Sequence, residues 1–187
     1  MALVCLIVGH RESAQGAVAV DGTTEWAWAR QHARKIALHL RAARAVPVII
    51  GRDDTPKGYS RLPAKVNDTG ADCAIALHFN SFSNPAATGS EVLYWHRSGR
   101  GRALAVELDK ADDVLGLRDR GRSGLRACDD DDRGAYILRE TAMPCALVEP
   151  GFGSNEGDWQ AITERGDALA EEQAGAVVRW LRAEGRL

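Results

Sequence analysis

Three ionisable residues, far apart in the sequence, each follow a short apolar run. His10 follows LIVG, His78 follows AIAL and Glu149 follows CALV. Such runs are typical of strands buried in a sheet, and in open α/β sheets ligands bind at the carboxyl ends of the strands. We therefore expect the three side chains to converge at one edge of a sheet. Burying them without partners costs several kcal/mol each, and a divalent cation would remove that cost.

A fourth ionisable residue, Glu25, lies at the start of the helix predicted after the first strand. The first turn of such a helix faces the same sheet edge as the carboxyl end of the strand before it. His10, Glu25 and His78 would then form a His2Glu set, which is one of the ligand combinations of catalytic zinc and leaves a fourth position for water. The ligands come from separate elements, not from one HExxH helix. The sequence therefore predicts one Zn²⁺ per chain.

Glu149 is the second glutamate of this predicted site, and Pro150 and Gly151 follow it directly. A glutamate beside a zinc-activated water can act as a general base and then as an acid toward a leaving amine. The rigid EPG turn would hold it in place, so we predict that Glu149 is catalytic and not a ligand. Taken singly, each of these residues also has a structural explanation: a hydrogen-bonded core histidine, or a carboxylate that caps a helix or pairs with arginine.

Positioning these residues requires strands that alternate with helices. A helix is predicted from a cap at Thr23 or Thr24 to residue 44, and further helices over 60–69, 100–115 and 162–181. Strands are predicted over residues 3–9, 46–50, 72–80, 90–96 and 145–149, with a short edge strand over 135–139. This alternation predicts a three-layer α/β fold with a central, mainly parallel (mixed) sheet. At 187 residues and 45% hydrophobic, the chain suits one domain over residues 1–187.

The least regular segment runs from residue 117 to 135, where arginines, glycines and an acidic run lie close together. A solvated surface loop is one interpretation of such a segment. The alternative is a loop that contacts substrate.

The overall charge and hydropathy exclude several classes of partner. With 24 Lys+Arg against 26 Asp+Glu the net charge is -2, so no broad basic field indicates nucleic-acid or anionic-membrane binding. No stretch approaches the roughly 20 apolar residues of a membrane helix, so we expect no membrane insertion. The N-terminal run has no basic flank and no cleavage pattern, which predicts a strand and not a signal peptide. We therefore expect synthesis in the cytoplasm.

The remaining cysteines and histidines are expected to be structural. Cys5, Cys73, Cys128 and Cys145 lack CxxC spacing, and three of them lie in apolar runs, which is typical of inert core thiols. Among the histidines, two fall within a helical pattern and one has no partner signal; these are His32, His39 and His96.

The order of several motifs resembles the zinc-dependent N-acetylmuramoyl-L-alanine amidases of the amidase-3 family, found in bacterial cell-wall amidases and phage endolysins. The resemblance covers nearly the whole chain. The motifs are GHRESAQGA with the helix-initial Glu25, ADCAIALHFNS around His78, GSEVLYW, RDRG near Arg120, and ILRETAMPCALVEPGFGSN. The chain departs from the family pattern in its RESAQG loop, in Pro150 after the glutamate, and in Phe79 within HxN.

The resemblance implies roles for individual residues. His10, Glu25 and His78 correspond to zinc ligands, and Glu149 corresponds to the catalytic acid/base. Asn80 matches HxN and Arg120 the RG segment, and both are assigned to substrate binding. The implied activity is zinc-assisted hydrolysis of the amide between N-acetylmuramic acid and L-alanine in peptidoglycan.

Two rival functions stay open from the sequence. A zinc exopeptidase or carboxypeptidase acting on free peptides would use similar ligands and a similar glutamate. A non-catalytic wall-binding protein could keep the fold, although Glu149 argues against it. With no wall-binding module visible in the sequence, we expect either a phage lysin released through a membrane hole or a catalytic domain of a larger protein; either would act on the bacterial cell wall.

Overall fold

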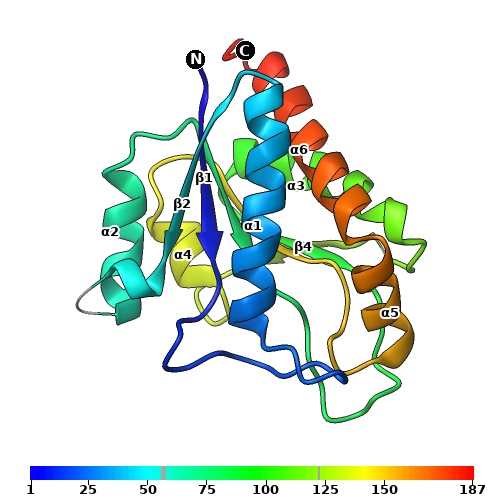
Figure 1. Cartoon of the computed structure of the whole chain (residues 1–187). Helices are drawn as coiled ribbons and strands as arrows, with labels where there is room; N and C mark the ends of the chain where they lie inside the picture. Colours follow the sequence, from blue (N-terminus) through cyan, green and yellow to red (C-terminus); the bar gives the residue numbers. More distant parts are fainter. Residues whose placement is uncertain (56–57, 122) are drawn as a thin grey trace.

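The computed structural model describes residues 1–55, 58–121 and 123–187, and it is built on one six-stranded sheet (Figure 1). The strand order is β2-β1-β3-β6-β4-β5. The strands are β1 (Leu3–Val8), β2 (Val46–Gly51), β3 (Cys73–Leu77), β4 (Glu91–Trp95), β5 (Leu125–Cys128) and β6 (Cys145–Glu149). This is the single α/β domain with a mixed, mostly parallel sheet that the sequence predicts.

Strand direction changes once across the sheet. β2, β1, β3 and β6 are mutually parallel, whereas β4 pairs antiparallel with β6 and β5 runs parallel to β4. The first residues of β4 therefore lie at the same edge as the last residues of β1, β3 and β6. Glu91, which opens β4, is directly opposite Glu149, which ends β6.

Helices cover both faces of the sheet, which makes three layers (Figure 1). α1 (Glu25–Ala42), α3 (Gly99–Asp112) and α6 (Gly166–Ala183) cover one face and enclose the larger core, with α5 (Glu156–Glu164) at the end of α6. The short helices α2 (Leu62–Asn67) and α4 (Ala135–Glu140) cover the other face. In the described ranges, three 3₁₀ turns complete the order: η1 (Arg52–Asp54), η2 (Gly58–Arg61) and η3 (Asp113–Leu115).

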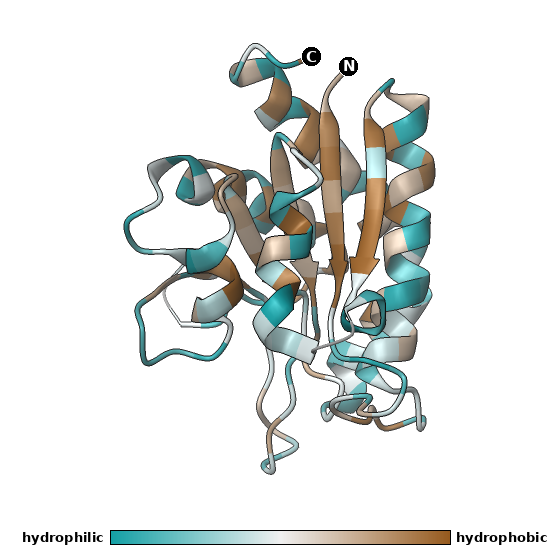
Figure 2. Cartoon of the chain, turned by 90° about the vertical axis from the view of Figure 1, so that its left-hand side faces the viewer, coloured by the Kyte–Doolittle hydropathy of each residue, from teal (hydrophilic) through white to brown (hydrophobic). Residues whose placement is uncertain are grey.

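Alternation along the central strands explains why both faces are buried. In β1, Val4, Leu6 and Val8 pack into the larger core, while Cys5 and Ile7 pack under α2 and α4. A strand covered on both faces is apolar at every residue, and not only at every second one. Figure 2 shows this for the strands, which are more hydrophobic than the helices around them. This continuous apolar pattern is what the sequence presents at LVCLIV.

Two predictions about the segment before β6 are wrong. The predicted edge strand over 135–139 is helix α4, because Ala135, Ile137 and Leu138 turn one apolar side onto the sheet; a short apolar run does not distinguish strand from helix. The edge strand is instead β5, inside the segment 117–135 that was expected to be a loop. Residue 122 of that segment lies outside the described residues.

The C-terminal helix predicted over 162–181 is two helices, α5 and α6, with a break at Arg165.

All four cysteines are buried and unpaired, and burial raises the pKa of Cys5 and of Cys145 to about 12. In the described part of the chain, no helix combines the length and apolar character needed to cross a bilayer.

Candidate metal and acid–base site

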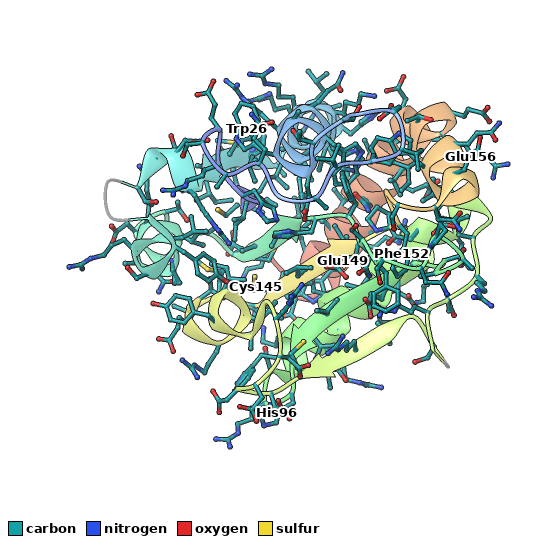
Figure 3. The ribbon with its side chains drawn as sticks, turned by 90° about the horizontal axis from the view of Figure 1, so that it is seen from below. Trp26, His96, Cys145, Glu149, Phe152 and Glu156 are labelled. Carbon is teal, nitrogen blue, oxygen red and sulfur yellow. The ribbon has the colours of Figure 1, made fainter. Side chains whose placement is uncertain are left out.

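The residues singled out in the sequence meet at one edge of the sheet, where β1, β3 and β6 end. Figure 3 looks onto this edge and shows Glu149 near the middle of it. A cavity of about 630 Å³ opens here. All six predicted site residues line it: His10, Glu25, His78, Asn80, Arg120 and Glu149.

His10, Glu25 and His78 form one compact group. Glu25 lies 2.9 Å from His10 Nε2 through Oε2 and 2.7 Å from His78 Nδ1 through Oε1. The two imidazole rings are 5.5 Å apart between centroids, edge to face. One ligand atom from each residue can be chosen so that all three lie within 4.8 Å of one another.

The helix start places Glu25 in this group. Thr24 caps α1 by accepting a hydrogen bond from the Ala27 N–H, so Glu25 is the first helical residue. Its side chain is buried, and its Oε2 also accepts from the Ala17 N–H. Burial alone would raise the pKa of Glu25, but the hydrogen bonds with His10 and His78 outweigh it and lower the pKa to about 2. The carboxylate is therefore ionised and available as a ligand.

Two glycines make room for the histidines. A Cβ at Gly9 would lie 2.6 Å from His78 Cε1, and one at Gly16 would lie 2.5 Å from His10 Cδ2. Gly16 also has φ +78°, which favours glycine. His10 itself has φ 61°, which is uncommon for a residue with a side chain and turns the chain sharply after β1.

The donors in this group suit a divalent transition metal. Two imidazole nitrogens and one carboxylate are the protein ligands of a three-ligand catalytic site. The side chains of the histidines are 28% and 17% exposed, so the group is open to the cavity on one side. These residues therefore suit such a metal, because they offer two nitrogen ligands and one oxygen ligand and leave solvent access for a fourth ligand.

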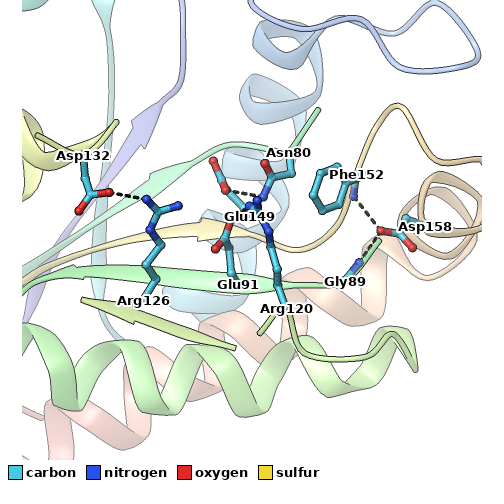
Figure 4. Close-up of polar contacts among 9 residues, drawn as sticks. All are labelled: Asn80, Gly89, Glu91, Arg120, Arg126, Asp132, Glu149, Phe152 and Asp158. Atoms are coloured by element: carbon cyan, nitrogen blue, oxygen red, sulfur yellow. Dashed lines mark hydrogen bonds and ion pairs between the residues drawn. The ribbon is translucent and has the colours of Figure 1, made fainter. Parts of the chain in front are cut away.

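Beside this group, Glu149 belongs to a second polar cluster, which Figure 4 shows in close-up. The Asn80 side-chain amide donates to Glu149 Oε2 at 2.7 Å and to Glu91 Oε1 at 2.6 Å. Arg120 forms an ion pair with Glu91. We call these four residues the carboxylate cluster: Asn80, Glu91, Arg120 and Glu149.

The carboxylate cluster perturbs the acidity of Glu149. Burial and the facing Glu91 raise the pKa of Glu149 well above its usual value, while Arg120 acts in the opposite direction with a smaller effect. Two carboxylates directly opposite each other cannot both ionise at ordinary cost, so the pair favours holding one proton. A carboxyl group whose pKa is raised in this way is a weaker acid, which suits a residue that first takes up a proton and then releases it.

Glu91 is the member of the cluster that the sequence did not identify. The two histidines of the site and Glu149 lie at or just after the carboxyl ends of parallel strands, whereas Glu91 lies at the amino end of an antiparallel one. One sequence feature does mark it: Glu91 directly precedes the apolar run VLYW, and a carboxylate there is buried with the strand. Only 4% of Glu91 is exposed, which is unusual for a glutamate.

Asp158 in α5 joins the loops that lead into the carboxylate cluster. Its carboxylate accepts hydrogen bonds from the Gly89 N–H at 2.9 Å and the Phe152 N–H at 3.0 Å (Figure 4). It also accepts one from the Thr88 hydroxyl at 2.5 Å. The loop before β4 and the turn after β6 are thus tied to one buried carboxylate. This fixes the relative positions of Glu91 and Glu149.

The other histidines lie outside the site. His32 is buried, with Nε2 2.8 Å from Gln173 Oε1. His96 is exposed and its Nδ1 lies 2.9 Å from the Cys128 carbonyl oxygen. His39 is partly exposed in the last turn of α1.

Comparison with known proteins identifies the family of the chain. A family model described as N-acetylmuramoyl-L-alanine amidase matches residues 4–179. The N-acetylmuramoyl-L-alanine amidase LytC of Bacillus subtilis is 27% identical over 173 residues, which are 91% of this chain and 32% of that protein. The probable cell wall amidase LytH of Staphylococcus saprophyticus is 33% identical over 112 residues, 60% of this chain and 35% of that protein. The chain thus spans about a third of the length of these relatives.

Solved structures share the fold over nearly all of the chain. The catalytic domain of CwlV, an N-acetylmuramoyl-L-alanine amidase from Bacillus (Paenibacillus) polymyxa, superposes with a TM-score of 0.82 at 24% identity and covers 97% of this chain and 99% of that one. An N-acetylmuramoyl-L-alanine amidase from Clostridium difficile gives 0.81 at 25% identity, with 98% of each chain covered. The family model covers far more than half of the sequence, so the chain belongs to the N-acetylmuramoyl-L-alanine amidase family.

Proposed function

We propose that this protein hydrolyses the amide bond between N-acetylmuramic acid and L-alanine in peptidoglycan. The observation that carries the proposal is the placement of the His10, Glu25 and His78 group and of Glu149 in one cavity. Membership of the amidase family supplies the reaction and the substrate class. We further propose that residues 1–187 act as one catalytic domain, with the bacterial cell wall as the place of action.

The metal in this proposal is Zn²⁺, one ion per chain, held by His10, Glu25 and His78. Mixed histidine and carboxylate ligation with one open position is the usual arrangement of catalytic zinc sites. The chemistry that zinc supplies in such sites is polarisation of the scissile carbonyl and a lowered pKa for a water molecule.

Glu149 moves the protons in the proposed reaction. Its carboxylate takes a proton from the attacking water and then delivers it to the nitrogen of the departing L-alanine. The raised pKa of Glu149 favours the second step, because a weaker carboxylic acid is still protonated when the leaving group needs its proton. The Asn80 amide holds the Glu149 side chain by donating to Oε2.

Asn80 and Arg120 are proposed to complete the substrate site from the side of β4. Both line the cavity, and both are held by Glu91, through a hydrogen bond and an ion pair. The guanidinium carbon of Arg120 also lies 5.2 Å from the centroid of the Phe152 ring, which restricts its position. Their contacts with substrate would orient the amide toward Glu149.

The test is a paired measurement on purified protein. We expect plasma emission spectrometry to find one zinc per chain, and mass spectrometry of digested cell walls to find stem peptides that begin with a free L-alanine amine. Cleavage of free peptides, with no release of L-alanine from muramic acid, would favour a zinc peptidase instead. Metal-free protein that binds walls without releasing peptide would favour a binding protein.

A further inference from the structure

The cavity extends from the candidate metal group, which is His10, Glu25 and His78, to the space under the two short helices α2 and α4. Ile7, Leu93 and Leu147 form part of its lining, from the sheet face that α2 and α4 cover. Tyr59 and Ile137 line it from η2 and α4. A ligand whose reacting bond lies at Glu149 therefore has an apolar space beside it, large enough for several more atoms.

Among the residues that the structure describes, four arginines line this same cavity: Arg52, Arg120, Arg126 and Arg133. Two of them are neutralised, because Arg120 pairs with Glu91 and Arg126 pairs with Asp132. Within the described ranges, neither Arg52 nor Arg133 has a carboxylate at ion-pair distance. Of these four guanidinium groups, two thus have no anionic partner among the described residues.

The carboxylates of the cavity do not supply the missing charge. Glu25 is held between His10 and His78, and Glu91 is already paired with Arg120. A divalent ion at the candidate metal group would add further positive charge. The cavity as a whole therefore favours an anionic ligand.

Arg52 is the more constrained of the two unpaired arginines. It follows β2 directly, it is partly buried, and its guanidinium carbon lies 4.0 Å from the centroid of the Tyr59 ring. Stacking on an aromatic ring fixes the plane of a guanidinium, so its donors are already oriented for a planar anion. Partial burial lowers the pKa of Arg52, which means that its charge lacks some of the stabilisation that an anion would provide.

We propose that Arg52 and Arg133 form a carboxylate-binding subsite for the acidic stem peptide, and that this subsite holds the residues that follow the scissile bond. The inference rests on the proposed function and names the part of the substrate that the cavity selects. In peptidoglycan the residue after L-alanine is a γ-linked glutamyl residue whose α-carboxyl group is either free or amidated. Arginine forms paired, charge-assisted hydrogen bonds with a carboxylate and not with a carboxamide, so the protein distinguishes the two forms.

The test is calorimetric titration of the zinc-loaded protein with two peptides. One is L-alanyl-γ-D-glutamyl-L-lysine with a free α-carboxylate on the glutamyl residue, and the other carries a carboxamide there. We expect the free acid to bind at least about tenfold more tightly than the amide. Arg52→Gln and Arg133→Gln should each weaken binding of the acid and leave binding of the amide nearly unchanged.

Two controls separate folding and bulk charge from the subsite. Arg133 is exposed, so Arg133→Gln tests the idea in a variant whose folding is not in question, and Arg52→Lys keeps the charge while removing the planar donor pair. Arg102→Gln removes an exposed arginine of α3, on the opposite face of the sheet, and should preserve the preference. Equal affinity of the wild-type protein for the two peptides, or no binding of either, would overturn the proposal.

Hydrolysis provides a second readout that separates this inference from the proposed function. With muropeptides of both kinds, Arg52→Gln should raise KM about tenfold for the free acid, with kcat changed by less than about twofold. Hydrolysis of the free acid and the amide with equal KM would support the amidase activity and contradict the subsite. Tighter binding of the free-acid peptide without any hydrolysis would support the subsite and contradict the proposed function.

Discussion

The facing carboxylates of Glu91 and Glu149 are the most unusual feature of the site at the scale of single residues. They are directly opposite in an antiparallel pair, where like charges destabilise a sheet. Asn80 offsets this by donating to both, and Arg120 offsets it by pairing with Glu91. The structure thus keeps a repulsive pair together, and the facing Glu91 adds to burial, the largest cause, in raising the pKa of Glu149.

Replacing Glu149 tests its role as the acid/base. We expect Glu149→Gln to fold and to keep its zinc, because Glu149 lies outside the His10, Glu25 and His78 group. Loss of the proton acceptor should lower kcat by roughly 10²–10⁴-fold. Zinc content and the rate of peptide release from cell walls measure the two effects. Cleavage at the wild-type rate would refute the assignment.

Replacing Glu91 tests the carboxylate cluster. Glu91→Gln removes the facing carboxylate that helps to raise the pKa of Glu149, and it frees Arg120 to lower that pKa further. Since the base form of Glu149 starts the reaction, the acidic limb of the kcat/KM profile should move to lower pH. A profile measured against the wild-type protein checks the direction. An unmoved limb, or one shifted to higher pH, would show that Glu91 does not set the acidity of Glu149.

The residues that the sequence identified share one property. His10, His78 and Glu149 each follow an apolar run, so the boundary between buried strand and polar loop marks them. Glu91 lies inside the pattern of its strand, and only the direction of β4 brings it to the site. Strand direction depends on the partner strand, which local sequence does not encode.

At the scale of elements, the sequence predicts the buried strands and the first long helix, but it misses the break between α5 and α6, the helix over 135–139 and the edge strand β5. The apolar run of β1 and the long amphipathic pattern of α1 each favour one structure. Residues 135–139 carry too few turns to show a period, and their helix depends on the sheet that it covers. β5 has an exposed centre, as suits an edge strand, so its four residues lack the apolar run that identifies a buried strand.

A buried polar chain links three helices behind the sheet. His32 of α1 donates from Nε2 to Gln173 Oε1 of α6, and Gln173 Nε2 donates to Asp112 Oδ1 of α3 at 2.7 Å. Burial lowers the pKa of His32 to about 4 and raises the pKa of Asp112 to about 8. Between these limits His32 and Asp112 are therefore both neutral, so the three hydrogen-bonded residues stay buried without a net charge.

The pKa shifts of His32 and Asp112 predict how the unfolding free energy depends on pH. Between pH 3.8 and about 8 the folded protein holds a proton on Asp112 that the unfolded chain has lost, so stability falls as pH rises. His32 has the opposite effect between about 4 and 6.5, where only the unfolded chain is protonated. Between about pH 4 and 6.5 the contributions of His32 and Asp112 offset each other, and of these two groups only Asp112 contributes from pH 6.5 to about 8.

Asp112→Asn should reduce the fall in unfolding free energy between pH 6.5 and 8. In the wild-type protein Asp112 costs about 2 kcal/mol of unfolding free energy between pH 6.5 and 8. The variant keeps the acceptor for Gln173 but has no proton to lose, so its unfolding free energy should change less over this range. Urea unfolding at both pH values measures the difference, in which the groups common to both proteins cancel. Identical pH dependence in the two proteins would show that Asp112 is not the responsible group.

At the scale of the whole molecule, the candidate metal group joins distant parts of one chain. His10 follows β1, Glu25 opens α1 and His78 follows β3, so three elements contribute one ligand each. The unfolded chain does not hold these residues together, and an ion that binds only the folded state stabilises it by mass action. Metal binding and global stability are therefore coupled.

Chelation should consequently lower the melting temperature. At a zinc concentration 100 times the dissociation constant the stabilisation is about 2.7 kcal/mol, which for a protein of this size corresponds to roughly 5–10 °C. Calorimetry with and without chelator measures it. Glu149→Gln should keep the full zinc-dependent shift, because its side chain is outside the metal group, whereas Glu25→Gln should lose most of it. If Glu25→Gln retained the shift, the ion would have to bind elsewhere. If instead Glu149→Gln lost the shift, Glu149 would have to be a ligand, and the division between a metal group and a separate acid/base would not hold.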